Sequence, residues 1–227
     1  MKLLTTNAKL SKDVKGFLVM GLQLAPHTIS GRNVCPNASK GCAAACLFTA
    51  GMGVYQRIKN ARIKKTQFFF EDHDTFMANL FAEIEYYVRR AKRKGLKLAL
   101  RLNTISDIAW EKKLFRGKNL FEHFPHVQFY DYTKTPARAI AFSKGELPKN
   151  YHLTFSRSES NGATAQLIAN LGVNVAVVFK KLPATFYGKK VVSGDKSDAR
   201  WKDKKGVIVG LVAKGKARKD QSGFVVL

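Results

Sequence analysis

The residues best suited to chemistry are three cysteines, Cys35, Cys42 and Cys46, in the stretch NVCPNASKGCAAACL. They are separated by six and then three residues, and the chain has no other cysteine. An odd and clustered set does not suit a disulfide framework, which needs paired and dispersed cysteines. Clustered thiolates are soft ligands that favour iron or zinc. We therefore predict a metal centre here.

Two metals are compatible with this spacing. Three thiolates suit a [4Fe-4S] cluster because each can bind a different iron. Zinc needs a fourth ligand, and His27, eight residues before Cys35, is a candidate for that role in either kind of centre. The alternative without metal is a set of three buried structural thiols. We favour the [4Fe-4S] cluster and keep zinc as the alternative.

The charge of the chain predicts a polyanionic partner. Forty Lys and Arg residues against sixteen Asp and Glu residues give a formal net charge of +24, which exceeds what solubility requires. Nucleic acid is the expected partner. An anionic membrane competes with it, but no apolar segment reaches the roughly 20 residues that span a bilayer, and the N-terminus has no secretory signal. We expect no membrane partner and a cytoplasmic location.

Basic and aromatic residues alternate in several places, as in proteins that bind single strands by stacking bases on aromatic rings within a positive groove. Tyr130 and Tyr132 are better explained as core residues. Trp201 lies in a charged loop, which favours exposure, and Trp110 fits either role. The predicted nucleic-acid contacts are Tyr55, Arg57, Lys59, Arg62, Trp110, Lys112, Lys113, Arg116, Lys134, Arg138, Arg157, Arg200, Trp201, Lys202, Lys214, Lys216 and Arg218.

The elements that must position these residues follow from hydrophobic periodicity. Residues 71–94 form the clearest helix, because apolar residues recur every three or four positions and Gly95 follows. The basic run that ends at Lys65 is also expected to be helical. Short apolar runs predict strands at 96–103, 127–133, 151–156, 173–179, 189–195 and 206–214, and helices are expected between them at 107–116, 136–144 and 163–171.

Strands that alternate with helices predict an α/β fold with a mostly parallel sheet, open or rolled into a partial (β/α) barrel. We expect a single domain, 1–227, in which an irregular N-terminal and cluster-binding segment (1–66) precedes a barrel-like core (67–227). Polar residues follow several strands, so the carboxyl ends of the strands should form the working rim. No catalytic residue is assigned. Weaker candidates on the rim are Asp107, Asp131, Glu159, Asp195 and Asp198, of which Asp107 could instead cap a helix.

Two resemblances extend this interpretation. Clustered cysteines ahead of a βα repeat resemble the radical S-adenosylmethionine enzymes, whose cluster leaves one iron free for the cofactor. The spacing here is wider than the usual three and two residues, and LALRLNTISDIAW stands where that superfamily has a Gly-Gly-Glu segment. These differences make S-adenosylmethionine doubtful as a cofactor, and a radical enzyme acting on nucleic acid or nucleotide is the alternative function.

The second resemblance covers nearly the whole chain. The stretches LRLNTISDIAW, FPHVQFYDYTKT, YHLTFSRSESN and GVIVGLVAKGKARKDQSGFVV, together with the cysteine segment, resemble an uncharacterised family of phage and plasmid proteins. This resemblance implies a viral iron–sulfur protein that binds single-stranded DNA in the cytoplasm of a bacterial host. It also implies a barrel inherited from radical enzymes. Apart from this resemblance, RNA is kept as the second candidate ligand.

Overall fold

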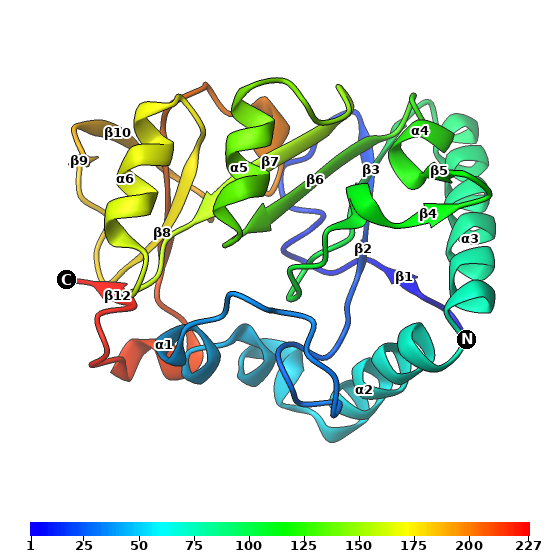
Figure 1. Ribbon diagram of the computed structural model, residues 1–227, viewed down its shortest axis with the longest axis horizontal. Helices are drawn as coiled ribbons and strands as arrows, with labels where there is room; N and C mark the ends of the chain where they lie inside the picture. Colours follow the sequence, from blue (N-terminus) through cyan, green and yellow to red (C-terminus); the bar gives the residue numbers. More distant parts are fainter.

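The computed structural model describes residues 1–227, apart from the side chain of Thr49. A largely parallel sheet forms its centre (Figure 1). The strands of this sheet are β1 (Leu4–Thr5), β2 (Phe17–Leu22), β3 (Lys97–Arg101), β6 (Gln128–Thr133), β7 (Tyr151–Ser156), β8 (Val175–Phe179), β9 (Thr185–Phe186), β10 (Lys189–Ser193), β11 (Ile208–Val212) and β12 (Val225–Val226). Their order is β1-β2-β3-β6-β7-β8-β11-β10-β9, with β12 also pairing with β8. Among the strand pairs that the structure describes in this sheet, only β1–β2 and β9–β10 are antiparallel.

Helices join most of the parallel strands. The α-helices are α1 (Lys40–Ala44), α2 (Gln56–Glu71), α3 (His73–Arg93), α4 (Leu120–His123), α5 (Pro136–Ser143) and α6 (Gly162–Asn170). Short 3₁₀ turns are η1 (Leu47–Thr49), η2 (Gly51–Val54), η3 (Trp110–Lys112), η4 (Arg200–Lys202) and η5 (Gly215–Lys219), and β4 (Leu114–Phe115) pairs with β5 (Lys118–Asn119) in a separate hairpin. Within the described chain, no helix has the length and apolar character needed to cross a membrane.

The predicted helix at 71–94 is present as α3. The Asp72 carboxylate caps its start by accepting a hydrogen bond from the Thr75 N–H at 3.2 Å. Its apolar stripe, which includes Phe76, Leu80 and Ile84, is fully buried against the sheet. The helix ends before Gly95, which has a positive φ of 64° that a residue without Cβ tolerates.

The two faces of the sheet are covered differently. The helices cover one face, where Phe129 of β6 belongs to a large core with α3 and α4. On the other face, Tyr130 packs with Leu10, Val14 and Ala199, so loops rather than helices fill that side. Alternation along the strand therefore sends neighbouring residues into different cores.

A mixed α/β fold with a largely parallel sheet is thus confirmed. From β2 to β8 the strands succeed one another in chain order, which is the order found in (β/α) barrels. The path of the described sheet ends at β1 and β9. Closure into a barrel stays a prediction.

Two sequence-based expectations were wrong. Residues 107–116 do not form a helix, because the side chains of this segment bind other loops: the Asp107 carboxylate accepts a hydrogen bond from the Lys134 N–H and pairs with Arg138 instead of capping a helix. Only η3 and the β4–β5 hairpin form there. The N-terminal segment is also more regular than expected, since β2 pairs with β3 in parallel within the central sheet.

Candidate functional site

The three cysteines lie on the segment that follows β2, residues 27–54, which we call the cysteine loop. It runs along the carboxyl ends of the parallel strands, at the lower edge in Figure 1. The Val34 carbonyl accepts a hydrogen bond from the Asp107 N–H at 2.8 Å, and Asn37 Nδ2 donates to Thr135 Oγ1 at 2.8 Å. The loop therefore contacts the segments that follow β3 and β6.

Glu159, in the segment after β7, anchors the start of α1. Its carboxylate accepts hydrogen bonds from the Gly41 N–H and from Ser39 Oγ, both at 2.7 Å. Desolvation opposes ionisation of this carboxyl, but these hydrogen bonds lower its pKa overall. An ionised Glu159 thus holds the helix that carries Cys42 against the rim. The expectation that rim carboxylates act as bases or metal ligands missed this anchoring contact.

Backbone N–H groups point at two of the sulfurs. The His27 N–H donates to Cys35 Sγ at 3.3 Å, and the Phe48 N–H donates to Cys46 Sγ at 3.5 Å. Cys42 is half-buried and packs against the small apolar core that contains Phe224. Hydrogen bonds of this kind stabilise thiolate sulfur, which is the form that binds metal.

Burial raises the pKa of two of the three thiols. Burial raises the pKa of Cys35 to about 12, with further increases from Cys46, Asp107 and Cys42, while the His27 N–H lowers it. Burial also raises the pKa of Cys46, partly offset by the Phe48 N–H and by the cations Lys134 and Arg62. Burial is thus the main cause of the raised pKa of Cys35 and of Cys46, and nearby positive charge would favour their thiolate forms.

The three cysteine side chains share one loop but do not converge on a single point. Among the described residues, no three His, Cys, Asp or Glu side chains converge closely enough to hold one metal ion. A cubane cluster places its sulfur ligands further apart, because each binds a different iron. Both the [4Fe-4S] cluster and the zinc alternative therefore stay predictions for these three thiols.

His27 is held by its own neighbours. Its Nδ1 accepts a hydrogen bond from the Thr28 N–H at 2.6 Å and lies 2.8 Å from Thr28 Oγ1. Its backbone has a positive φ of 55°, and its N–H donates to Cys35 Sγ. The described contact with the cysteines is therefore a backbone one, and a role for the His27 ring as fourth ligand stays a prediction.

Several predicted cations surround the cysteine loop. Arg62 donates to Gln23 at 2.7 Å, Lys134 donates to Ser156 at 2.9 Å, and Arg157 donates to the Gly223 carbonyl at 2.6 Å. Elements next to the loop, α2 and the η5 segment, carry most of the others. These are the half-buried Lys59 and the exposed Arg57, Lys214, Lys216 and Arg218. The predicted aromatic contact Tyr55 is also exposed, at the N-cap of α2.

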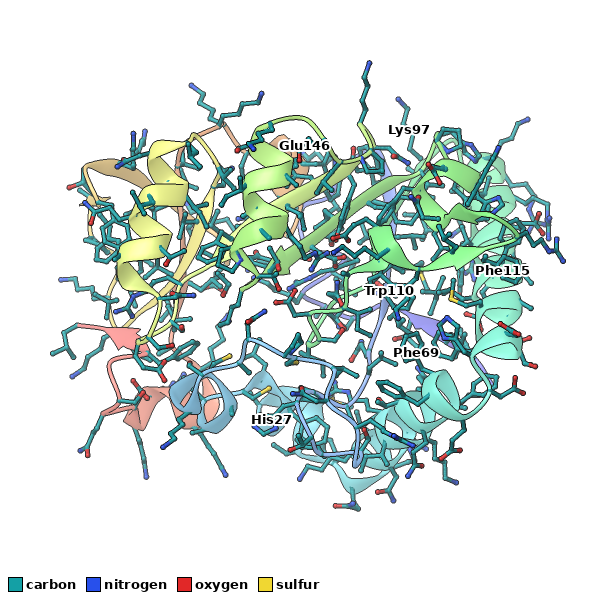
Figure 2. The ribbon with its side chains drawn as sticks, viewed as in Figure 1. His27, Phe69, Lys97, Trp110, Phe115 and Glu146 are labelled. Carbon is teal, nitrogen blue, oxygen red and sulfur yellow. The ribbon has the colours of Figure 1, made fainter. Side chains whose placement is uncertain are left out.

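Three predicted nucleic-acid contacts are buried, and for them the prediction was wrong. Trp110 is 0% exposed, within the core between α2 and the sheet, where its ring centroid lies 5.5 Å from that of Phe69 (Figure 2). Arg138 is 5% exposed and pairs with carboxylates. Arg200 is 1% exposed and forms an ion pair with Asp203 at 3.1 Å.

Other predicted contacts lie away from the loop. Trp201 is half-buried on the loop-covered face, with ring centroids 5.0 Å from Phe17 and 4.8 Å from Tyr130, and Lys202 lies over the same Phe17 ring. Phe17 begins β2, so this group sits at the end of the strand opposite the cysteine loop. Arg116 lies over Phe115 and Phe81, beside α3.

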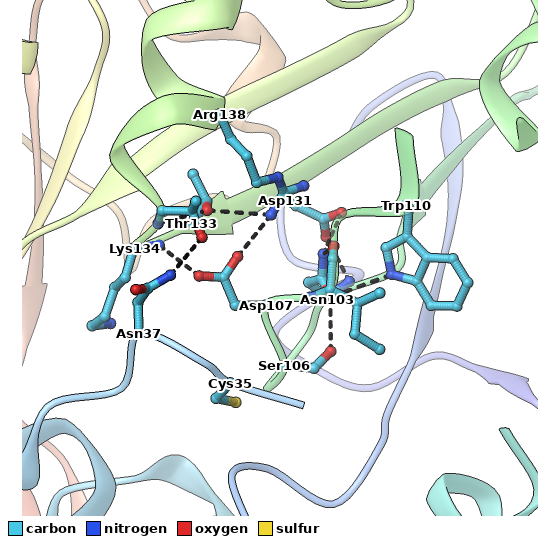
Figure 3. A network of polar contacts seen from close by, with 12 residues as sticks. Cys35, Asn37, Asn103, Ser106, Asp107, Trp110, Asp131, Thr133, Lys134 and Arg138 are labelled. Atoms are coloured by element: carbon cyan, nitrogen blue, oxygen red, sulfur yellow. Dashed lines mark hydrogen bonds and ion pairs between the residues drawn. The ribbon is translucent and has the colours of Figure 1, made fainter. Parts of the chain in front are cut away.

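Next to Cys35, a buried polar network fixes the segment that follows β3 (Figure 3). Arg138 pairs with Asp107 at 2.7 Å and with Glu111 at 2.6 Å, and donates to Tyr151 Oη at 2.7 Å. Asp131 accepts hydrogen bonds from the Asn103 N–H at 2.6 Å and from Tyr151 Oη at 3.1 Å. Sequence analysis missed this network, because its members are spread over forty-nine positions, from 103 to 151, with no motif.

The arrangement can now be compared with known proteins. A family model for gene product 88 matches residues 1–226. The chain belongs to the gene product 88 family. The expected membership of an uncharacterised phage family is thereby confirmed. No curated protein matches the chain, and no solved structure matches it either. The gene product 88 assignment covers the cysteine loop, the sheet and η5 together.

Proposed function

We propose that this gene product 88 protein binds single-stranded nucleic acid, preferably single-stranded DNA, in the cytoplasm of a bacterial host. In this proposal Cys35, Cys42 and Cys46 hold a structural [4Fe-4S] cluster. The observation that carries the proposal is the placement of the cysteine loop on the rim of the sheet with cationic side chains on both sides of it. Sheet order supports a partial (β/α) barrel as the scaffold, because such barrels bind ligands at that rim.

Charge supports a phosphodiester ligand. The chain carries a net charge of +24, and the exposed cations Arg57, Lys216 and Arg218 flank the loop. Phosphate contacts release counterions, so affinity should fall steeply with salt. If about five phosphates are neutralised on a single strand, a threefold rise in salt should weaken binding roughly fiftyfold.

The cluster would act by ordering the loop. Thiolates of Cys35, Cys42 and Cys46 would hold three irons, and the cluster supplies the positive charge that the buried thiols lack. The His27 and Phe48 N–H groups would remain on the sulfurs.

One preparation tests both halves of the proposal. Protein purified without oxygen should contain iron and sulfide, should be brown, and should retain a fluorescent single-stranded oligonucleotide better than the duplex. A Cys42→Ser variant should lose iron and weaken this binding. Colourless protein that contains zinc would show that the cysteines bind zinc instead of a cluster. Affinity that does not change over a threefold range of salt would refute the electrostatic account.

A further inference from the structure

A groove of about 550 Å³ lies beside Cys35, a size within the range of ligand sites, roughly 300–1,000 Å³. One wall comes from the cysteine loop, with Asn33 and Pro36, and another from the end of α2, with Phe69 and Phe70. The segment that contains η3, with Lys112, forms a third wall. The groove therefore joins the loop to two elements that carry aromatic and basic side chains.

Phe70 presents an exposed and well-supported ring. It is 40% exposed at the end of α2, whereas its neighbour Phe69 is 4% exposed. The two ring centroids lie 5.1 Å apart at an interplanar angle of 84°, and Phe69 is itself fixed by Trp110 and Phe76. A large apolar ring held at the surface by a buried neighbour is the kind of platform on which a base stacks.

Cations lie around this platform. The Arg32 guanidinium lies over the Phe70 ring at 5.8 Å from its centroid, and Lys113 Nζ lies 6.0 Å from the Phe69 centroid. Arg32 and Lys112 are exposed. A guanidinium beside an exposed ring can stack on a base or pair with the adjoining phosphate.

The groove also contains two carboxylates, and both pair with Arg138. It pairs with Asp107 at 2.7 Å and with Glu111 at 2.6 Å. Among the described lining residues, the cations Lys112, Lys113 and Arg138 outnumber these two carboxylates. An approaching phosphate therefore meets a net positive wall.

We propose that this groove binds one unstacked base of a single strand, stacked on Phe70, with Arg32, Lys112 and Lys113 at the adjoining phosphates. The inference rests on the proposed function and names the place where a base is held. The polar edges of Asn33 and Asn37 line the same groove and can hydrogen-bond a base edge.

The test measures binding of a fluorescent single-stranded oligonucleotide by anisotropy. Phe70→Ala should weaken binding roughly fivefold to a hundredfold, the range for loss of one stacked base. Phe70→Trp should retain affinity. The matched control is Leu167→Ala, which removes an apolar side chain, 66% exposed, from α6, a helix of uncharged residues; it should not change binding. The salt dependence of Phe70→Ala should equal that of wild type, because no charge is removed.

Wild-type protein should also bind an oligonucleotide with abasic sites more weakly than the normal strand, and Phe70→Ala should lose most of that difference. Wild-type protein that retains no oligonucleotide would overturn the proposed function itself. Wild-type affinity in Phe70→Ala, with wild-type binding intact, would overturn the groove inference alone. If Phe70→Ala fails to fold, equal binding of abasic and normal strands by wild-type protein would overturn the groove inference.

Discussion

Arg138 should contribute to stability through its two buried ion pairs, and Arg138→Met tests this assignment. The substitution removes the guanidinium from two carboxylates whose side chains are only 10% and 8% exposed, Asp107 and Glu111. Removing one partner of a buried ion pair costs about 3–5 kcal/mol, because an uncompensated charge stays buried. For a chain of this length, that loss corresponds to a fall in Tm of roughly 6–20 °C.

Urea denaturation of wild-type and Arg138→Met protein measures this loss directly. Neutralising the stranded carboxylates in an Arg138→Met, Asp107→Asn, Glu111→Gln triple variant should recover most of it. Lys144→Met is the control, since Lys144 and Glu146 form an exposed pair at 3.9 Å that should contribute less than about 1 kcal/mol. A loss below about 1 kcal/mol in Arg138→Met, or no recovery in the triple variant, would refute the reasoning.

Two further predictions concern the anchoring of the cysteine loop and the pH dependence of stability. In the proposed function, Glu159→Gln should release the iron of the cluster to a chelator several times faster than wild type, because the carboxylate that holds Ser39 and Gly41 is lost. Glu146→Gln is the control, and equal release rates would contradict the anchoring role. Burial lowers the pKa of His152 to about 4, with smaller effects from Arg200 and Lys205. Between about pH 6.5 and 4, His152 therefore takes up a proton in the unfolded chain but not in the folded one. Stability falls as the pH drops through that window. Relative to His152→Asn, wild-type protein should lose about 2 kcal/mol between pH 7 and pH 5 in urea titrations; parallel pH profiles for the two proteins would exclude His152. The comparison with a variant is needed because burial raises the pKa of Asp131 to about 7, which gives the opposite slope.

Local patterns were sufficient to predict most of the regular elements. The apolar run at 151–156 is β7, and the run at 136–144 is α5 within one residue, since Pro136 starts the helix and positions beyond Ser143 leave it. Tyr130 was correctly assigned to the core, because β6 is covered on both faces and buries Phe129, Tyr130 and Asp131 in succession. Such elements depend on neighbours in sequence.

The errors occurred where long-range contacts override local preference. Trp110 lies in a basic stretch, yet its indole Nε1 donates to Asn103 Oδ1 at 3.3 Å inside the core. Arg138 was interpreted as a phosphate contact, but Asp107 and Glu111 lie thirty-one and twenty-seven residues away in sequence and neutralise it. Phe70 and Arg32 were not considered, because only the fold brings the end of α2 beside the cysteine loop.

The position of the cysteines determines what a cluster can stabilise in this molecule. All three predicted ligands lie within residues 35–46, so a cluster would cross-link only a short loop and would restrict little of the unfolded chain. The main cores are built from strands and helices, and Cys35 packs against the edge of the largest of them. The loop itself is held on the rim by hydrogen bonds to Asp107, Thr135 and Glu159 and by a few buried side chains, among them Val34. In the proposed function, losing the cluster should therefore disorder the groove wall at Asn33 and Pro36 while the sheet stays folded, which makes nucleic-acid affinity a more sensitive measure of the cluster than global stability.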